Sequence, residues 1–407
     1  MSFQFPDSVI PDHVPQELVR PFPFMFGVTT DRDPFGELAR DVHEGPELIY
    51  APTAYPGGTP AWVPRTMDDL RKIYLDTDHF SSTDFSPYSK LIGANWINSP
   101  AELDPPAHGP FRQMVNPAFT PKAMAALEEK IRSYAVEYID DLAPGGRCEF
   151  MSDFAFEFPI KVFMELMGLP HDRMAEFLDW EMKLLHNHDM ASMAEAVRKV
   201  VAYLAEEIES RRSNPTEDLL TFAVQSKIGD RPLNQDELIG FGFNLFIGGL
   251  DTVSTNMGLH FLHLARSAGD QQLLRENPDR IPHAIDELMR AYGAVTTFRT
   301  CKRETTIRGI TIKPGDKVAM STTLAGRDPA EFENPADVRF DRKPRHVGFG
   351  FGPHTCVGMH LARRELRIAM EEFLARVPVF RLPDDYTVEY HLGMIQPVAL
   401  PLEWAPA

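Results

Sequence analysis

One cysteine of this 407-residue chain lies in a sequence that favours metal chemistry. Cys356 belongs to the segment FGFGPHTCVG, residues 349–358, which directly precedes the strongly helical sequence MHLARRELRIAMEEFLARV. Gly350 and Gly352 permit a tight turn, and Gly358 leaves room for a flat cofactor because it has no side chain. A helix N-terminus favours the thiolate over the thiol, and only the thiolate binds a metal. The segment therefore predicts a thiolate that can ligate a metal ion.

Two other interpretations of this cysteine stay open at this point. It could be a buried structural cysteine in a glycine-rich loop, or the nucleophile of a Cys–His hydrolase that needs no cofactor. The glycine-rich approach and the absence of an oxyanion-type context disfavour the hydrolase. Cys148 and Cys301 lie far from Cys356 at irregular spacing, so the three cysteines predict neither a disulfide framework nor a zinc pair.

The longest helical pattern, at about residues 235–266, carries a second group of interest. Asn234 and Glu237 predict a capping box at its start. At ~1.5 Å per residue such a helix would be on the order of 45 Å long and would cross the core of the molecule. Gly248 and Gly249 lie in its middle, where each costs up to ~1 kcal/mol relative to alanine. We therefore expect a function that offsets this cost.

The remaining patterns predict an α+β fold that is predominantly α, with a long central helix and small peripheral β-sheets. The βαβ alternation of a nucleotide-binding fold is missing. Breakers such as proline, glycine and asparagine bound the patterns. The clearest helical patterns cover 121–142, 191–212 and 281–292, and the β patterns cover 47–51, 305–312 and 317–321.

The composition excludes several classes of protein. With 43% hydrophobic and 25% charged residues the chain is an ordinary globular protein. Its formal net charge of -18 repels phosphate backbones and anionic lipids, so neither nucleic acid nor a membrane is an expected partner. The proline-rich segment 1–25 contains no apolar run long enough for a signal peptide or membrane span. We expect a cytoplasmic, unanchored protein.

The order Phe-Gly-x-Gly-x-His-x-Cys-x-Gly resembles the haem-binding signature of the cytochrome P450 family. The resemblance runs from about residue 60 to Trp404 and is strongest to the camphor 5-monooxygenases of soil bacteria, which share the strings GGLDTV at 248–253 and VALPLEW at 398–404. It implies a single haem domain over residues 1–407. It also implies haem b (iron protoporphyrin IX) as the cofactor, with Cys356 as the ligand of the iron.

The resemblance extends to residues that would hold the haem. His108 and Arg112 are four residues apart and so share a helix face, which in isolation would be an ordinary solvated face. The haem propionates need cationic or hydrogen-bonding partners when buried. The residues that match the family's propionate ligands are His108, Arg112, Arg299 and His354, and those that match its other haem contacts are Phe349, Gly358, Gly248 and Gly249.

A further match concerns structure and not catalysis. Glu287 and Arg290 are three residues apart on one predicted helix face, a spacing typical of weak surface ion pairs. Together with Arg342 they resemble the Glu–Arg–Arg core triad of the family. We expect the three side chains to stabilise the cysteine side of the protein.

The resemblance implies monooxygenation, in which one oxygen atom of O2 enters an unactivated C–H bond. The two glycines would let the long helix distort and make room for dioxygen. Thr252 would hold the reduced dioxygen and its water, and Asp251 would relay protons from solvent. The alternatives are close helix packing at the glycines and a surface role for Asp251. A haem-thiolate sensor or carrier without turnover is the alternative function, and such a protein should lack this pair.

Electrons must come from another protein, because the chain has no flavin or nicotinamide fingerprint. The family's soluble bacterial members generally use a 2Fe-2S ferredoxin with an NADH-dependent ferredoxin reductase. We expect that pair as the redox partners, and the chain itself as a monomer. The cations that could steer an acidic ferredoxin are Arg71, Lys72, Lys343, Arg345, Arg363, Arg364 and Arg367.

The expected substrate site differs from that of the camphor enzymes. Trp96 stands where those enzymes carry a tyrosine whose hydroxyl holds the substrate ketone, which puts camphor in doubt. Asn244 precedes Gly248 by four residues and so shares a helix face with the oxygen site. The expected substrate contacts are Trp96, Asn244 and Val295. Alternatively, Trp96 could only line the wall of the substrate cavity, and Asn244 could bond a neighbouring helix. We expect an apolar terpenoid or norisoprenoid of roughly ten to fifteen carbons with at most one carbonyl.

Overall fold

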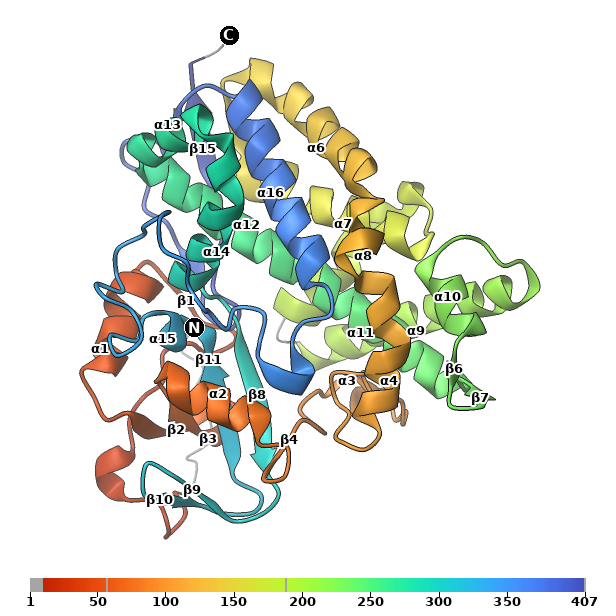
Figure 1. The fold of residues 1–407 in the computed structure, drawn as a ribbon, viewed down its shortest axis with the longest axis vertical. Coiled ribbons are helices and arrows are strands. Elements are labelled where there is room, and N and C mark those ends of the chain that lie inside the picture. The colour runs from red at the N-terminus through yellow and green to blue at the C-terminus, as the bar shows by residue number, and fades with distance from the viewer. Residues whose placement is uncertain (1–9, 56–57, 187–188, 406–407) are drawn as a thin grey trace. The chain divides into compact units, whose positions relative to one another are not determined.

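The computed structural model describes residues 10–55, 58–186 and 189–405, so the first nine residues of the proline-rich segment 1–25 lie outside the described residues. The chain forms two compact units. Unit 1 contains the chain up to Phe85 together with Pro282–Cys356 and Thr387–Val398, and unit 2 contains Ser86–Ile281, Val357–Tyr386 and the chain from Ala399 onward. Helices predominate and the sheets are small (Figure 1), which confirms the expected fold class.

Unit 2 is mainly helical, with short strands at its edges. The strands form a three-stranded sheet in the order β12-β15-β5 and a β6-β7 hairpin. The elements are α3 (Tyr88–Leu91), α4 (His108–Val115), α5 (Pro121–Ala125), α6 (Glu128–Leu142), β5 (Arg147–Glu149), α7 (Glu157–Met167), α8 (Met174–Glu181), α9 (Met190–Ser213), α10 (Leu219–Gln225), β6 (Lys227–Ile228), β7 (Arg231–Pro232), α11 (Gln235–Gly249), α12 (Asp251–Arg266), α13 (Ala268–Glu276), α16 (Met359–Arg376), β12 (Phe380–Arg381) and β15 (Pro401–Trp404).

Unit 1 contains the largest sheet, in the order β2-β3-β11-β8-β4. The β3–β11 pair is parallel, and β8 pairs antiparallel with β11 so that Arg299 lies opposite Val318. The elements are β1 (Thr29–Thr30), α1 (Ala39–His43), β2 (Leu48–Tyr55), β3 (Thr59–Pro64), α2 (Met67–Leu75), β4 (Phe80–Ser81), α14 (Ile281–Ala291, its first residue in unit 2), β8 (Thr296–Cys301), β9 (Thr305–Ile307), β10 (Ile310–Ile312), β11 (Lys317–Ser321), α15 (Thr322–Gly326), β13 (Tyr390–His391) and β14 (Gln396–Pro397).

Most of the expected elements are present where the sequence predicts them. The pattern at 121–142 becomes α5 and α6 with a short break between them, and the pattern at 191–212 becomes α9. In the 305–312 hairpin, Arg308 and Gly309 both have positive φ (52° and 77°), as a tight turn between β9 and β10 requires. The sequence prediction missed β3 and β8, whose short runs carry no clear alternation.

The long central helix is interrupted beside its two glycines. The predicted capping box is present, because Asn234 and Glu237 each accept a hydrogen bond from the other's backbone. α11 ends at Gly249 and α12 begins at Asp251, so the helix is interrupted at Leu250, whose ψ of -72° lies at the edge of the helical region. The segment 235–266 is also apolar enough to pass for a membrane span, but 72% of its most apolar window is buried inside the protein, as in a core helix.

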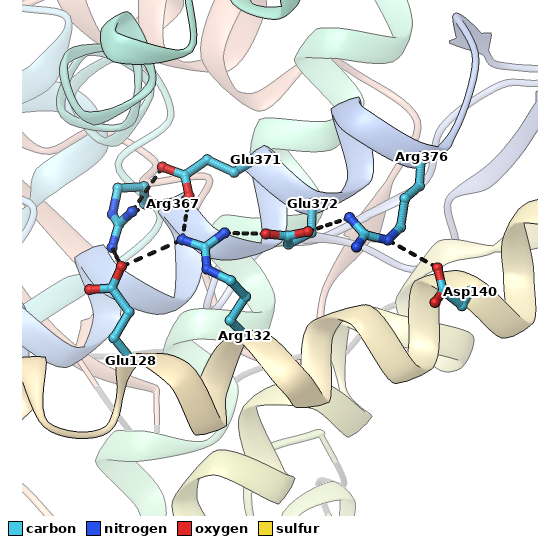
Figure 2. Close-up of polar contacts among 7 residues, drawn as sticks. All are labelled: Glu128, Arg132, Asp140, Arg367, Glu371, Glu372 and Arg376. Atoms are coloured by element: carbon cyan, nitrogen blue, oxygen red, sulfur yellow. Dashed lines mark hydrogen bonds and ion pairs between the residues drawn. The ribbon is translucent and has the colours of Figure 1, made fainter.

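An ion-pair network fixes α16 against α6 (Figure 2). Arg132 of α6 lies between Glu371, at 2.7 Å, and Glu372 of α16. Arg367 of α16 bonds back to Glu128 at the start of α6, at 2.8 Å. Because several charges share partners, the network orients the two helices better than isolated surface pairs would. α16 begins three residues after Cys356, so the network holds the helix that directly follows the cysteine segment in the chain.

Glu287 and Arg290 are fully buried in unit 1 and form the expected triad with Arg342. The Glu287 carboxylate lies 2.8 Å from Arg290 and 3.1 Å from Arg342. Arg290 also donates to three backbone carbonyls, those of Gly326, Pro335 and Asp337, each at 2.8 Å. The triad therefore satisfies polar backbone groups of the irregular segment that leads to the cysteine.

Candidate haem and oxygen site

Cys356 differs from the other two cysteines in its surroundings. Its side chain is exposed in this protein-only structure, whereas Cys148 and Cys301 are buried. Burial raises the pKa of the Cys148 thiol to about 12 and that of Cys301 to about 11. Those two thiols are therefore protonated and enclosed, and neither is suited to bind a metal. Of the three, only Cys356 offers an accessible sulfur.

The segment before Cys356 is shaped by two left-handed glycines. Gly350 and Gly352 both have φ of 70°, a conformation that other residues adopt only with strain. The turn closes when the Cys356 amide donates to the Phe349 carbonyl at 2.8 Å. Gly358 follows as the N-cap of α16. The tight turn expected from the sequence is thus present.

Two of the expected propionate ligands lie in unit 1. Arg299 is buried at 7% exposure on β8, with its guanidinium carbon 5.5 Å from the centre of the Tyr74 ring. His354 lies in the cysteine segment and shares a hydrogen bond of 3.2 Å with the Ser82 hydroxyl. Val295, the expected substrate contact of this unit, immediately precedes β8, and its backbone bonds to Thr322.

The other two expected propionate ligands lie in unit 2 on one short helix. His108 is the first residue of α4 and is buried, and Arg112 follows one turn later, half-buried. The predicted common helix face is therefore present. An imidazole and a guanidinium on one helix face suit carboxylates that must leave water.

The two glycines of the long helix have different environments. A Cβ built on Gly248 meets no atom within 4 Å, whereas one on Gly249 would approach the Phe163 ring at 3.2 Å. Close packing thus accounts for Gly249 but not for Gly248. The open space beside Gly248 fits a bound group, and the chemistry of Cys356, Arg299 and His108 fits an iron ligand and propionate partners. On these observations the residues of each unit suit haem.

Asp251 and Thr252 begin α12, directly after the helix interruption. The Thr252 hydroxyl donates to the Gly248 carbonyl at 2.9 Å, which ties the threonine to the distorted turn. Asp251 is fully buried and lies 3.1 Å from the His186 ring nitrogen through one carboxylate oxygen. Its other oxygen has no hydrogen-bond partner among the described residues. The surface role considered for Asp251 is therefore wrong.

Trp96 is buried at 4% exposure, and its indole N–H has no hydrogen-bond partner in the described part of the chain. Its ring packs against Phe243 of α11 with the centroids 4.6 Å apart. Asn244, the next residue of α11, is half-buried, and its side chain makes no hydrogen bond to any described residue. The neighbouring-helix bond considered for Asn244 is therefore not formed.

The loop that carries Trp96 is held rigidly, in a way the sequence analysis missed. The buried Glu102 carboxylate accepts from the Ser86 amide at 2.9 Å and from the Asn98 side chain at 2.9 Å. A Cβ on Gly240 of α11 would overlap the Ile97 carbonyl oxygen, so the loop lies directly on the helix. The only signal in the sequence was a glycine in a helix interior, where it costs up to ~1 kcal/mol.

Comparisons with known proteins agree with this chemistry. The chain matches the family model Cytochrome P450 over residues 20–385. It is 38% identical over 403 residues to the probable cytochrome P450 127A1 of Sinorhizobium fredii (strain NBRC 101917 / NGR234), with 97% of each chain covered. It is 33% identical to the mycinamicin IV hydroxylase/epoxidase of Micromonospora griseorubida, over 86% of this chain and 91% of that protein. The crystal structure of cytochrome P450 CYP101C1 superimposes with a TM-score of 0.86 at 34% identity, covering 98% of this chain and 100% of that chain.

Proposed function

This chain belongs to the cytochrome P450 family of haem-dependent monooxygenases, and we propose that it hydroxylates an unactivated C–H bond of a terpenoid or norisoprenoid ketone. Residues 1–407 would act as one cytoplasmic haem domain. Haem held by the Cys356 thiolate would supply oxygen activation, since a thiolate ligand favours O–O cleavage. The chain's own residues bind the substrate and handle the protons.

The observation that carries the substrate proposal is the buried, unpartnered indole N–H of Trp96. A buried donor without an acceptor costs about 1–3 kcal/mol, so a ligand that supplies an acceptor recovers that free energy on binding. An indole offers one donor and no acceptor. It therefore suits a ligand with a single carbonyl or ether oxygen and disfavours polyhydroxylated ligands.

The surroundings of Trp96 favour an apolar body on that ligand. Trp96 belongs to a buried cluster of unit 2 that includes Phe243, Phe246 and Leu245 of α11. Asn244 is the polar exception on this stretch and offers a second site for one oxygen. Apolar walls with one or two fixed polar groups are typical of sites that orient small lipophilic molecules.

Replacing Trp96 with phenylalanine tests this hydrogen bond. We expect the Kd of an ionone-like ketone to rise by about tenfold, the loss of one buried hydrogen bond. A hydrocarbon of the same skeleton without the carbonyl should bind the parent and the variant about equally. Titration of the low-to-high-spin change of the haem measures both affinities. An equal loss for both ligands would assign Trp96 a purely steric role.

Thr252 and Asp251 would supply the protons that oxygen activation consumes. Replacing Thr252 with alanine is expected to lower product per NADH consumed by about tenfold or more, since directed proton transfer contributes at least ~10²-fold in enzymes. NADH oxidation should continue, with the electrons appearing as hydrogen peroxide.

The matched control for Thr252 is Ser254, whose hydroxyl makes the same kind of bond, to the Leu250 carbonyl at 3.1 Å. Ser254→Ala should leave the product per NADH at the parental level. Peroxide and product are measured in the same reaction. Parental coupling in Thr252→Ala would contradict the role of that hydroxyl.

A 2Fe-2S ferredoxin with its NADH-dependent reductase is the proposed electron source. The cations expected to steer it carry less net positive charge than the sequence suggests, because many are paired with carboxylates of the same unit. The pairs are Arg71–Glu331, Lys72–Asp68, Arg364–Glu128 and Arg367–Glu371.

Two measurements test the proposed function as a whole. The reduced enzyme with carbon monoxide should give the red-shifted Soret band of a thiolate-ligated haem. A panel of monoterpenes, ionone-like ketones, camphor, fatty acids and polar metabolites should then give high-spin conversion and hydroxylated product with the terpenoid and norisoprenoid members. Strong conversion of camphor would show that Trp96 does not exclude camphor from the substrate site. Spin change without product from any compound would favour a sensor or carrier.

A further inference from the structure

Unit 1 contains a cavity that lies outside the haem, oxygen and substrate residues described above. Its volume is about 500 Å³, and the residues that line it belong to the segment 20–49. Small-molecule sites typically have volumes of roughly 300–1,000 Å³, so the cavity is large enough for a ligand. Among the described residues, none that is assigned to the haem, to oxygen or to the proposed substrate lines it. The cavity is therefore a candidate site for a different ligand.

The apolar part of the lining comes from two elements. Leu38 ends the short helical turn η2 (Pro34–Leu38) and Val42 lies four residues later in α1, so both share one face. Ile49 of β2 projects away from the core cluster that contains its neighbour Tyr50, because side chains alternate along a strand. The three apolar side chains of the lining are at most 8% exposed. They form a surface on which an apolar chain can pack.

The walls of the cavity are held in place by contacts within the unit. Arg65, at the end of the β2–β3 hairpin, donates to the carbonyls of Gly45 and Pro46, each at 3.1 Å. Pro21 and Pro23 also line the cavity, and the proline rings restrict the backbone of that segment. A site that is already formed loses little free energy to ordering when a ligand binds.

Charged side chains at the cavity fall into a paired and an unpaired set. Arg32 and Asp41 neutralise each other at 2.8 Å. Arg20 donates to the Val19 carbonyl at 2.8 Å, and neither Arg20 nor Glu44 forms an ion pair with any described residue. A cation and an anion therefore line the same cavity without meeting. A ligand that carries both charges can bridge them, which a ligand with one charge cannot.

We propose that this cavity binds a zwitterionic amphiphile, such as a long-chain amino acid or a betaine. The anionic group binds Arg20, and the cationic group binds Glu44. The apolar chain packs against Leu38, Val42 and Ile49. A simple carboxylate would lie beside the unpaired Glu44, and a simple amine beside the unpaired Arg20, so each should bind more weakly. The site is independent of the proposed monooxygenation.

Isothermal titration calorimetry of the haem-loaded protein at low ionic strength tests this ligand class. The probes share a ten-carbon skeleton and differ in charge: α-aminodecanoate, decanoate, decylammonium and decanol. The zwitterion should bind at least about threefold more tightly than the other probes, because one exposed charge contact changes a Kd by up to about fivefold. Shortening the zwitterion by two buried methylenes, to α-aminooctanoate, should raise its Kd by about tenfold.

Two substitutions separate the contributions of the two charges. Arg20→Gln should reduce the affinity for α-aminodecanoate to about that of decylammonium for the parent, and Glu44→Gln to about that of decanoate. The matched control is Arg40→Gln, since Arg40 is an exposed arginine of α1 that does not line the cavity. All three side chains are exposed, so the variants should fold like the parent.

The outcomes distinguish this site from the substrate site. Parental affinity of Arg20→Gln for α-aminodecanoate, or no measurable binding by the parent, would overturn the proposal. A loss in Arg20→Gln without a loss in Glu44→Gln would overturn the zwitterionic class, because the cavity would then recognise an anion alone. These measurements need no turnover, so a failure of the proposed monooxygenase function would leave them unaffected.

Discussion

Replacing Cys356 with serine is expected to reduce product formation to the level of a protein-free control while the chain stays folded. Serine is nearly the same size, but its neutral, harder oxygen cannot supply the electron density that a thiolate gives to the iron. The red-shifted Soret band of the reduced carbon-monoxide complex should disappear, even if some haem is retained.

The matched control is Cys301→Ser. Cys301 is buried, and its thiol donates to the Arg303 carbonyl at 2.9 Å, a bond that a serine hydroxyl can also make. We expect this variant to keep the spectrum and the activity of the parent. Turnover by Cys356→Ser at the rate of Cys301→Ser would contradict the assignment of the iron ligand.

Local sequence signals predicted the parts of the site that lie close together along the chain. Glycines at fixed spacing indicate the tight turn of the cysteine segment, and both Gly350 and Gly352 adopt left-handed conformations. The capping box of Asn234 and Glu237 and the distortion next to Gly249 are likewise local events. Such features depend on a few neighbouring residues, so a single sequence contains the information for them.

Contacts between distant segments were not predictable in the same way. His186 and Asp251 are 65 residues apart, and neither spacing nor composition indicates that they meet. Whether Glu102 is buried in a hydrogen-bonded network or solvated depends on the whole fold of unit 2. The Glu287–Arg290 pair shows the same limit, since its spacing alone is typical of a weak surface pair. Only the resemblance to a known family indicated its burial.

Replacing Glu287 with glutamine is expected to destabilise the protein by about 3–5 kcal/mol, the usual cost of leaving a buried charge without its partner. The carboxylate accepts from Arg290 at 2.8 and 2.9 Å, from Arg342 at 3.1 Å and from the Arg339 amide at 3.0 Å. Glutamine keeps the shape, but its amide NH2 group would face one of these donors. The side chains of Glu287 and Arg290 are 0% exposed, so water cannot replace the lost bonds.

The destabilisation should first affect the segment before Cys356, because Arg290 holds the carbonyls of Gly326, Pro335 and Asp337 in place. Urea unfolding followed by the haem spectrum should therefore show loss of the thiolate-type carbon-monoxide complex at a lower urea concentration than in the parent. The control is Asp341→Asn, the same change of acid to amide in the nearby Arg339–Asp341 pair, whose side chains are 45% and 67% exposed. Water replaces that contact, so the urea midpoint of Asp341→Asn should stay close to the parental value. Equal midpoints for Glu287→Gln and Asp341→Asn would show that the buried triad does not hold the cysteine segment.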